Sequence, residues 1–198
     1  MVEFFCDLNH VTQALLATIF TWSVTALGAA LVFLFKTIKK NIMDAMLGFA
    51  AGVMISASFW SLLSPAIEMA ENLKMVTWLV ATAGFFGGGL LLFIGDKIFT
   101  KLSKNKKYNN NSFRRCLMLI FSITLHNIPE GLAVGVAFGS LSYGLDGTTL
   151  AATSLLALGI GIQNFPEGTA VSVPLRREGM SRKKAFFFGQ LSGIVEPI

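Results

Sequence analysis

The sequence carries little charge. Only 14% of its 198 residues are Asp, Glu, Lys or Arg, whereas a soluble domain carries about 25%. Apolar residues make up 54% of the chain, the mean hydropathy is +0.65, and Phe outnumbers Tyr and Trp by 18 to 2 and 3. This composition excludes an ordinary soluble domain and predicts an all-α polytopic membrane protein.

Cysteine is scarce as well. Cys6 and Cys116 lie 110 residues apart and form no CxxC pair, which excludes a disulfide framework and a thiolate metal site. The first ten residues include Glu3 and Asp7 but no Lys or Arg. They therefore lack the positive start of a secretory signal, and we expect the first apolar stretch to stay in the membrane.

Long apolar runs dominate what is present. A bilayer core of roughly 30 Å needs about 20 apolar helical residues. The sequence predicts one transmembrane domain over residues 1–198 with six helices, the last of them incomplete. The predicted helices cover residues 11–35, 45–67, 76–95, 116–139, 149–175 and 184–198.

The basic residues predict the orientation of these helices. Fifteen of the sixteen Lys and Arg residues fall between helices one and two, three and four, or five and six, and only Lys74 lies on the other side. The positive-inside rule then places the N-terminus outside and the loop 97–115 in the cytoplasm. The net charge of +5 therefore requires no nucleic-acid partner.

A ten-residue pattern repeats in the fourth and fifth predicted helices. Segments 125–134 and 162–171 share Asn, Pro, Glu, Gly, Ala and Val in register at an offset of 37 residues, with His in the first copy replaced by Gln in the second. Residues three and four apart share a helix face. Each copy therefore brings three polar side chains together, namely His126, Asn127 and Glu130, and Gln163, Asn164 and Glu167.

The prolines of the repeat predict a kink in each helix. Pro129 and Pro166 each lack an N–H and leave a carbonyl of the preceding turn unbonded, which lipid tolerates only where the backbone is buried or lines a cavity. A carboxylate in mid-membrane costs at least roughly 2.5–3.5 kcal/mol and marks a functional site by default. Glu196, followed by Pro197, is a third such carboxylate.

Divalent cations would neutralise the three glutamates, since the predicted helices contain no Lys or Arg beyond Lys184 at the very start of the last one. Oxygen donors with one imidazole suit zinc, iron, manganese or cadmium, and the absence of thiolates argues against copper(I). Other interpretations stay open for single features. A Pro-Glu pair can be a structural kink with a protonated Glu, and the two asparagines can join helices by hydrogen bonds.

The repeat, together with the Glu196-Pro197 pair, resembles the ZIP (Zrt/Irt-like protein) family of divalent metal transporters, and its bacterial branch in particular. The resemblance implies two metal sites that share glutamates and no cofactor other than the transported ions. It assigns one ion to His126, Glu130, Gln163 and Glu167, and a second to Asn127, Asn164 and Glu196 with the two bridging glutamates.

The second predicted helix resembles its counterpart in the family. The resemblance implies that Met54 and Ser61 line the transport pathway, and that Asp44 and Glu68 are way-stations for the ion at the two ends of this helix. From the residues alone, a methionine such as Met54 is more often a lipid-facing or core side chain, and the two acids are equally well explained as ordinary helix-end charges.

This chain departs from the family pattern in two ways. The family has eight helices, whereas six are predicted here, so the sequence is expected to be a truncated form. Gln163 stands where other members carry His, which predicts looser and less selective metal binding.

The sequence therefore predicts a non-enzymatic transporter that takes zinc, and also cadmium, iron or manganese, into the cytoplasm. We expect it in the plasma or inner membrane, surrounded by lipid, with small-residue helix faces that leave room for a homodimer. The alternatives are a proton- or sodium-coupled carrier of an organic substrate and an intramembrane metalloenzyme. No HExxH sequence is present for the second.

Overall fold

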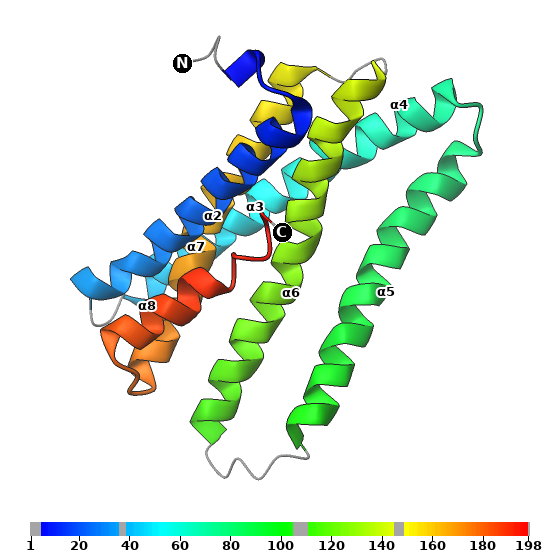
Figure 1. Ribbon diagram of the computed structural model, residues 1–198. Coiled ribbons are helices and arrows are strands. Elements are labelled where there is room, and N and C mark those ends of the chain that lie inside the picture. The colour runs from blue at the N-terminus through cyan, green and yellow to red at the C-terminus, as the bar shows by residue number, and fades with distance from the viewer. Residues whose placement is uncertain (1–4, 36–38, 105–110, 145–148, 198) are drawn as a thin grey trace.

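The computed structural model describes residues 5–35, 39–104, 111–144 and 149–197. The described residues form helices and contain no strand (Figure 1). The order is α2 (His10–Leu34), α3 (Lys40–Ser56), the π-helix η1 (Ala57–Leu63), α4 (Ser64–Asn72), α5 (Thr77–Lys104), α6 (Asn111–Ser140), the 3₁₀ turn η2 (Leu141–Tyr143), α7 (Leu150–Arg177) and α8 (Arg182–Leu191).

Side-chain caps set where three of the helices begin. Asn9 accepts a hydrogen bond from the Thr12 N–H at 2.8 Å at the start of α2. Thr149 caps α7 through Ala152 N at 3.1 Å, and Ser181 caps α8. Each cap pairs a backbone donor that the first helical turn leaves unbonded.

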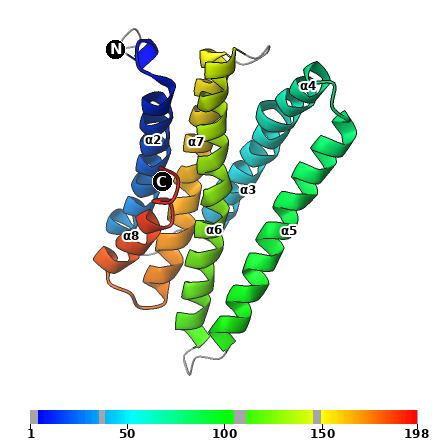
Figure 2. The ribbon, with the colours of Figure 1, turned by 45° about the vertical axis from the view of Figure 1, so that its right-hand side comes forward.

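Helix α7 is the central element of the bundle. It packs most extensively against α2 and also contacts α3, α6 and α8 (Figures 1 and 2). Two glycines allow the close approach of α2 and α7. A Cβ at Gly28 would overlap the carbonyl of Phe165, and a Cβ at Gly168 would overlap that of Thr25. The glycines therefore bring the α2 backbone alongside the repeat segment of α7.

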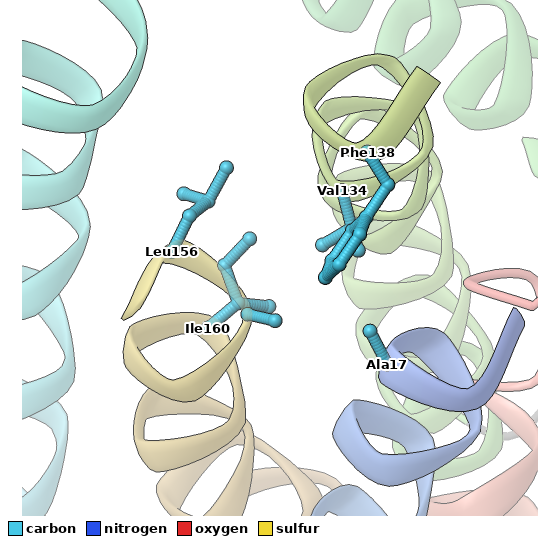
Figure 3. Packing of buried hydrophobic residues seen from close by; sticks show 6 residues of the cluster. Ala17, Val134, Phe138, Leu156 and Ile160 are labelled. Atoms are coloured by element: carbon cyan, nitrogen blue, oxygen red, sulfur yellow. The ribbon is translucent and has the colours of Figure 1, made fainter. Parts of the chain in front are cut away.

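A buried apolar cluster joins α2, α6 and α7 at one end of the bundle. Ala17, Val134, Phe138, Leu156 and Ile160 form it together with Ala157 (Figure 3). The members on α6 and on α7 are spaced four residues apart, so each helix presents one apolar stripe to the others. This packing holds the two repeat-bearing helices side by side.

Four described helices are long and apolar enough to cross a bilayer, namely His10–Leu34, Lys40–Trp60, Thr77–Gly95 and Ile120–Tyr143. Helix α7 has 28 residues, which is long enough to cross, but its buried Gln163, Asn164 and Glu167 lower its hydropathy. A helix buried among other helices does not need an apolar surface all round. The count of six spans stays a prediction.

Several helix ends differ from the predicted ones. Helix α5 runs to Lys104 and α6 begins at Asn111, because the charged ends of a membrane helix extend beyond its apolar stretch. The expected loop 97–115 is therefore largely helical where it is described. The expected second helix, 45–67, is α3, η1 and α4 in succession. Helices α6 and α7 continue through Pro129 and Pro166, and their kinks stay a prediction.

The sixth predicted helix is shorter than expected. We expected a helix over 184–198, whereas α8 ends at Leu191 and residues 192–197 form turns. Backbone bonds from Gly193 N to Gln190 O and from Glu196 N to Gly193 O close these turns. Glu196 therefore reaches the bundle interior from a turn, which lies at mid-height beside α6 in Figure 1.

The basic segments gather at one end of the bundle. The start of α3, the end of α5 and the junction of α7 with α8 all lie at the lower end in Figure 1, opposite the start of α2. These segments carry Lys39, Lys40, Lys101, Arg177 and Arg182. The arrangement agrees with the alternation of basic loops along the sequence.

Candidate metal centre

Helix α6 supplies the first two polar side chains of the site. His126 and Glu130 lie one turn apart on the same face, with His126 Nε2 at 3.4 Å from Glu130 Oε1. The Glu130 side chain is buried, and the Nε2 atom of His126 is buried although its ring is partly exposed. A nitrogen donor and a carboxylate thus face one point inside the bundle.

Helix α7 brings the second copy of the repeat to the same point. Gln163 Nε2 donates a hydrogen bond to Glu130 Oε1. Ligand atoms of His126, Glu130 and Glu167 all lie within 4.8 Å of one another. One imidazole and two carboxylates at this spacing match the donor types that zinc takes in proteins.

Glu196 joins the site from the turn after α8. Asn164 Nδ2 lies 3.0 Å from Glu196 Oε1 and 2.9 Å from Oε2, within donating distance of both. The same turn is held to α6, because Asn127 Nδ2 donates to Ser192 O at 2.9 Å. The third carboxylate is therefore buried beside α7 although it lies outside a helix.

Many of the atoms that could bind a metal in this site are buried and have no hydrogen-bond partner. Six of the seven predicted ligands, all except His126, are at most 9% exposed. Among the described residues, buried side-chain atoms without a partner include His126 Nε2, Asn127 Oδ1, Glu130 Oε2, Gln163 Oε1, Asn164 Oδ1 and both Glu167 oxygens. Buried polar atoms are normally paired, so this concentration of unpaired acceptors fits a cation site.

Like charges also meet in this site. Glu130 interacts repulsively with both Glu167 and Glu196. Three carboxylates in a low-dielectric interior stay ionised together only beside a counter-cation. The donor set therefore suits divalent metal ions of the zinc class.

A cavity of about 160 Å³ leads to the His126 end of the site. Its lining includes His126, Glu130 and Gln163 of the site together with Ser58 and Leu62 of η1. The volume corresponds to about five water molecules at roughly 30 Å³ each. It is therefore large enough for an ion that keeps part of its hydration shell. π-Helical turns are frequent at functional sites.

The structure describes the side chains of two of the four predicted pathway residues of the second helix. Asp44 on α3 and Glu68 on α4 are exposed and do not belong to the cluster of metal-binding side chains. The side chains of Met54 and Ser61 lie outside the described part of the structure. The pathway roles of these four residues stay predictions.

Helix α2 also contributes to the site, which the two copies of the repeat do not predict. Thr21 O accepts a hydrogen bond from Asn164 Nδ2 at 3.2 Å, and Thr25 Oγ1 lies 3.5 Å from Glu196 Oε1. Both threonines are fully buried. The sequence does hold a sign of this contribution, because Thr18, Thr21 and Thr25 follow helical spacing on a mostly apolar helix.

Comparison with known proteins identifies the family. The family model described as "ZIP Zinc transporter" matches residues 11–115 and 110–198. Zinc transporter ZIP11 of Xenopus tropicalis is 40% identical, with 96% of this chain and 79% of the relative covered. Zinc transporter ZupT of Streptococcus mutans is 34% identical, over 96% and 73%.

A third relative, Zinc transporter ZIPB of Bordetella bronchiseptica, is 34% identical over 96% of this chain and 61% of its own length. The bacterial relatives agree with the expected bacterial branch, and the relatives are named as transporters rather than enzymes. The match of the family model over nearly the whole chain, with a buried carboxylate cluster in a bundle of apolar helices, shows that this chain is a multi-pass membrane protein of the ZIP zinc transporter family.

Proposed function

We propose that this chain carries Zn²⁺ across the membrane into the cytoplasm through the centre formed by α6, α7 and the turn after α8. The observation that carries the proposal is the buried group of His126, Glu130 and Glu167, whose ligand atoms lie within 4.8 Å of one another. Relatives named as zinc transporters support it.

Two ions occupy this centre in the proposal. His126, Glu130, Gln163 and Glu167 hold the first ion. The second is held by Asn127, Asn164 and Glu196, with Glu130 and Glu167 bridging the pair. The unpaired oxygens of both asparagines support this assignment, because an amide oxygen is a hard donor that suits a divalent cation.

The donor set also makes the site permissive. It combines one imidazole with carboxylate and amide oxygens, which suit iron, manganese and cadmium besides zinc. Gln163 supplies a neutral amide oxygen that binds metal more weakly than an imidazole does. We therefore propose that the site accepts several divalent ions and that zinc is the main cargo.

The ion enters from the side where α2 begins and leaves on the side of the basic segments. Lysines and arginines gather at the start of α3, the end of α5 and the junction of α7 with α8. Such residues mark the cytoplasmic side of a membrane protein. The N-terminus then lies outside, in the plasma or inner membrane.

Uptake of zinc into proteoliposomes tests the transport function. We expect the parent chain to take up zinc and, more slowly, cadmium. Glu167→Ala is expected to reduce uptake at least about 100-fold, since it removes two buried oxygens that have no other partner. The exposed Glu178→Gln in the same region of the chain serves as the control. Zinc binding by the parent without any uptake would contradict transport while leaving the metal site in place.

Acid pH is expected to weaken zinc binding. The three glutamates and His126 bind metal only when deprotonated, so protons compete with zinc for the same atoms. Stability gained from zinc is therefore present at neutral pH and lost as the pH falls. Calorimetric titration should give an affinity at least about tenfold weaker at pH 5 than at pH 7. Equal affinities would show that these groups are not the ligands.

A further inference from the structure

Three threonines of α2 form a buried polar stripe that belongs to neither copy of the repeat. Thr18, Thr21 and Thr25 are between 0% and 4% exposed. Thr18 and Thr21 donate to backbone carbonyls of their own helix, Thr18 to Ala14 O at 3.0 Å and Thr21 to Thr18 O at 2.9 Å. Such bonds satisfy a hydroxyl without any ligand. Thr25 differs from the other two in that its bond to its own helix is longer, at 3.3 Å. Its Oγ1 lies within reach of the Glu196 carboxylate, which Thr21 also approaches.

Thr25 has two acceptors for a single hydroxyl hydrogen. Its Oγ1 lies 3.3 Å from Thr21 O and 3.5 Å from Glu196 Oε1. Both distances exceed the usual O–H···O range of about 2.5–3.0 Å, so a small shift of the side chain decides which acceptor it bonds. Thr25 can therefore donate to Glu196 when the carboxylate is charged. The Thr21 carbonyl stays close to the hydroxyl after this change.

The turn after α8 leaves space for this contact. A Cβ at Gly193 would lie 3.0 Å from both Thr25 Oγ1 and Glu196 Oε1, which is tighter than an ordinary contact. Trp22, one turn before Thr25 on α2, donates its indole N–H to Gln190 O at 3.0 Å. The end of α8 and the carboxylate that follows it are thus held against α2.

The side-chain amide of Asn164, which donates to Glu196, is also a ligand in the proposed centre. Asn164 Nδ2 contacts both Glu196 oxygens, while Asn164 Oδ1 is a proposed ligand of the second ion. A shift of this amide toward the ion alters its bonds to Glu196. Thr25 lies near Oε1, so Oε2 becomes available to the metal once the Asn164 amide has shifted away from it.

We propose that Thr25 is a positioning residue for Glu196, whose hydroxyl holds Oε1 so that Oε2 faces the second metal ion. The inference rests on the proposed two-ion centre. Thr25 does not bind the ion itself. Its contribution is one hydrogen bond to a charged group, which corresponds to about a tenfold effect on affinity.

Zinc titration of the purified chain by calorimetry tests this role. The second ion is defined as the zinc equivalent that Glu196→Gln removes. Thr25→Val keeps the shape of the side chain and removes the hydroxyl, and we expect it to weaken that equivalent about tenfold. Thr25→Ser keeps the hydroxyl and should stay within about twofold of the parent. In the Glu196→Gln background, Thr25→Val should not weaken the binding of the remaining zinc any further.

Thr153→Val is the matched control, because Thr153 is also buried and its hydroxyl donates to Leu150 O within α7. Parent-like binding of the second zinc by Thr25→Val, or equal losses in Thr25→Val and Thr25→Ser, would overturn the inference and leave the proposed transport intact. If Thr25→Val does not fold, Thr25→Ala is judged by the same criterion. A parent chain that binds no zinc would overturn both proposals.

Discussion

Replacing Gly168 by alanine is expected to lower the unfolding temperature by about 6–12 °C. The new Cβ would overlap Thr25 O, a backbone atom of α2. Relief of the overlap requires the two helices to separate, whereas a flexible side chain would simply rotate away. Overpacking of a core costs typically 1–3 kcal/mol, and a clash with backbone lies at the upper end. In a chain of this length, 1 kcal/mol corresponds to roughly 2–4 °C.

The same reasoning applies to Gly28→Ala, whose Cβ would overlap Phe165 O. Phe165 O also accepts a hydrogen bond from Thr169 Oγ1, which bonds Gly28 O as well. Separation of α2 from α7 at this crossing would therefore break the bond from Thr169 Oγ1 to Gly28 O as well as the packing contacts. Thermal unfolding followed by circular dichroism in detergent measures the effect.

Gly159 supplies the control within α7. A Cβ there meets nothing within 4 Å, and alanine is favoured over glycine inside a helix by roughly 0.5–1 kcal/mol. Gly159→Ala should therefore unfold at the parent temperature or slightly above it. Equal losses at positions 159 and 168 would mean that glycine at 168 is not required for helix packing.

Glu130→Gln is expected to remove most of the stabilisation that zinc confers. A ligand at 1,000 times its dissociation constant stabilises a protein by about 4.1 kcal/mol, which corresponds to roughly 8–16 °C here. Glu130 contacts His126 and accepts a hydrogen bond from Gln163. The variant keeps an amide oxygen for Gln163 but loses the charge, and a loss of at least about 100-fold in affinity would reduce the zinc-induced shift to about a third.

The metal-free variant should be as stable as the parent or more stable. A neutral amide costs less to bury than a carboxylate, and the repulsion of Glu130 by Glu167 and Glu196 disappears. Glu71→Gln, at an exposed position on α4, should leave both unfolding temperatures unchanged. A full zinc-induced shift in Glu130→Gln would exclude Glu130 from the site.

These two predictions distinguish the effect of helix packing on stability from the effect of metal binding. Gly168→Ala acts in the absence of metal and moves the whole of α7 relative to α2. Glu130→Gln acts mainly in the presence of zinc. A single variant that shows both effects would indicate that metal binding and helix packing depend on the same contacts.

Much of the site could be predicted from local sequence. The spacing of His126 and Glu130 places them one helical turn apart, and the structure has their side chains 3.4 Å apart. The register of the repeat predicted that Gln163 and Glu167 share a face of α7, which follows from helix geometry alone. Composition and the long apolar runs likewise predicted a helical membrane protein.

Relations between distant segments could not be predicted in this way. The turn that carries Glu196 was expected to be helical, because its apolar residues continue the pattern of α8. Tertiary bonds from Asn127 to Ser192 O and from Asn164 to Glu196 hold it as a turn instead. Thr25 of α2 is 171 residues from Glu196 along the chain, and spacing along the chain says nothing about such a contact.

Composition and local spacing were enough to establish the helical class, the membrane setting and the two sets of polar side chains, since each depends on overall hydropathy or on residues within one helical turn. Three further features arise only in the folded bundle: the two sets face each other, Glu196 approaches from a turn, and α2 takes part. The part taken by α2 depends on its close crossing with α7 at Gly28 and Gly168, because the missing side chain of a glycine matters only when a second helix packs against it.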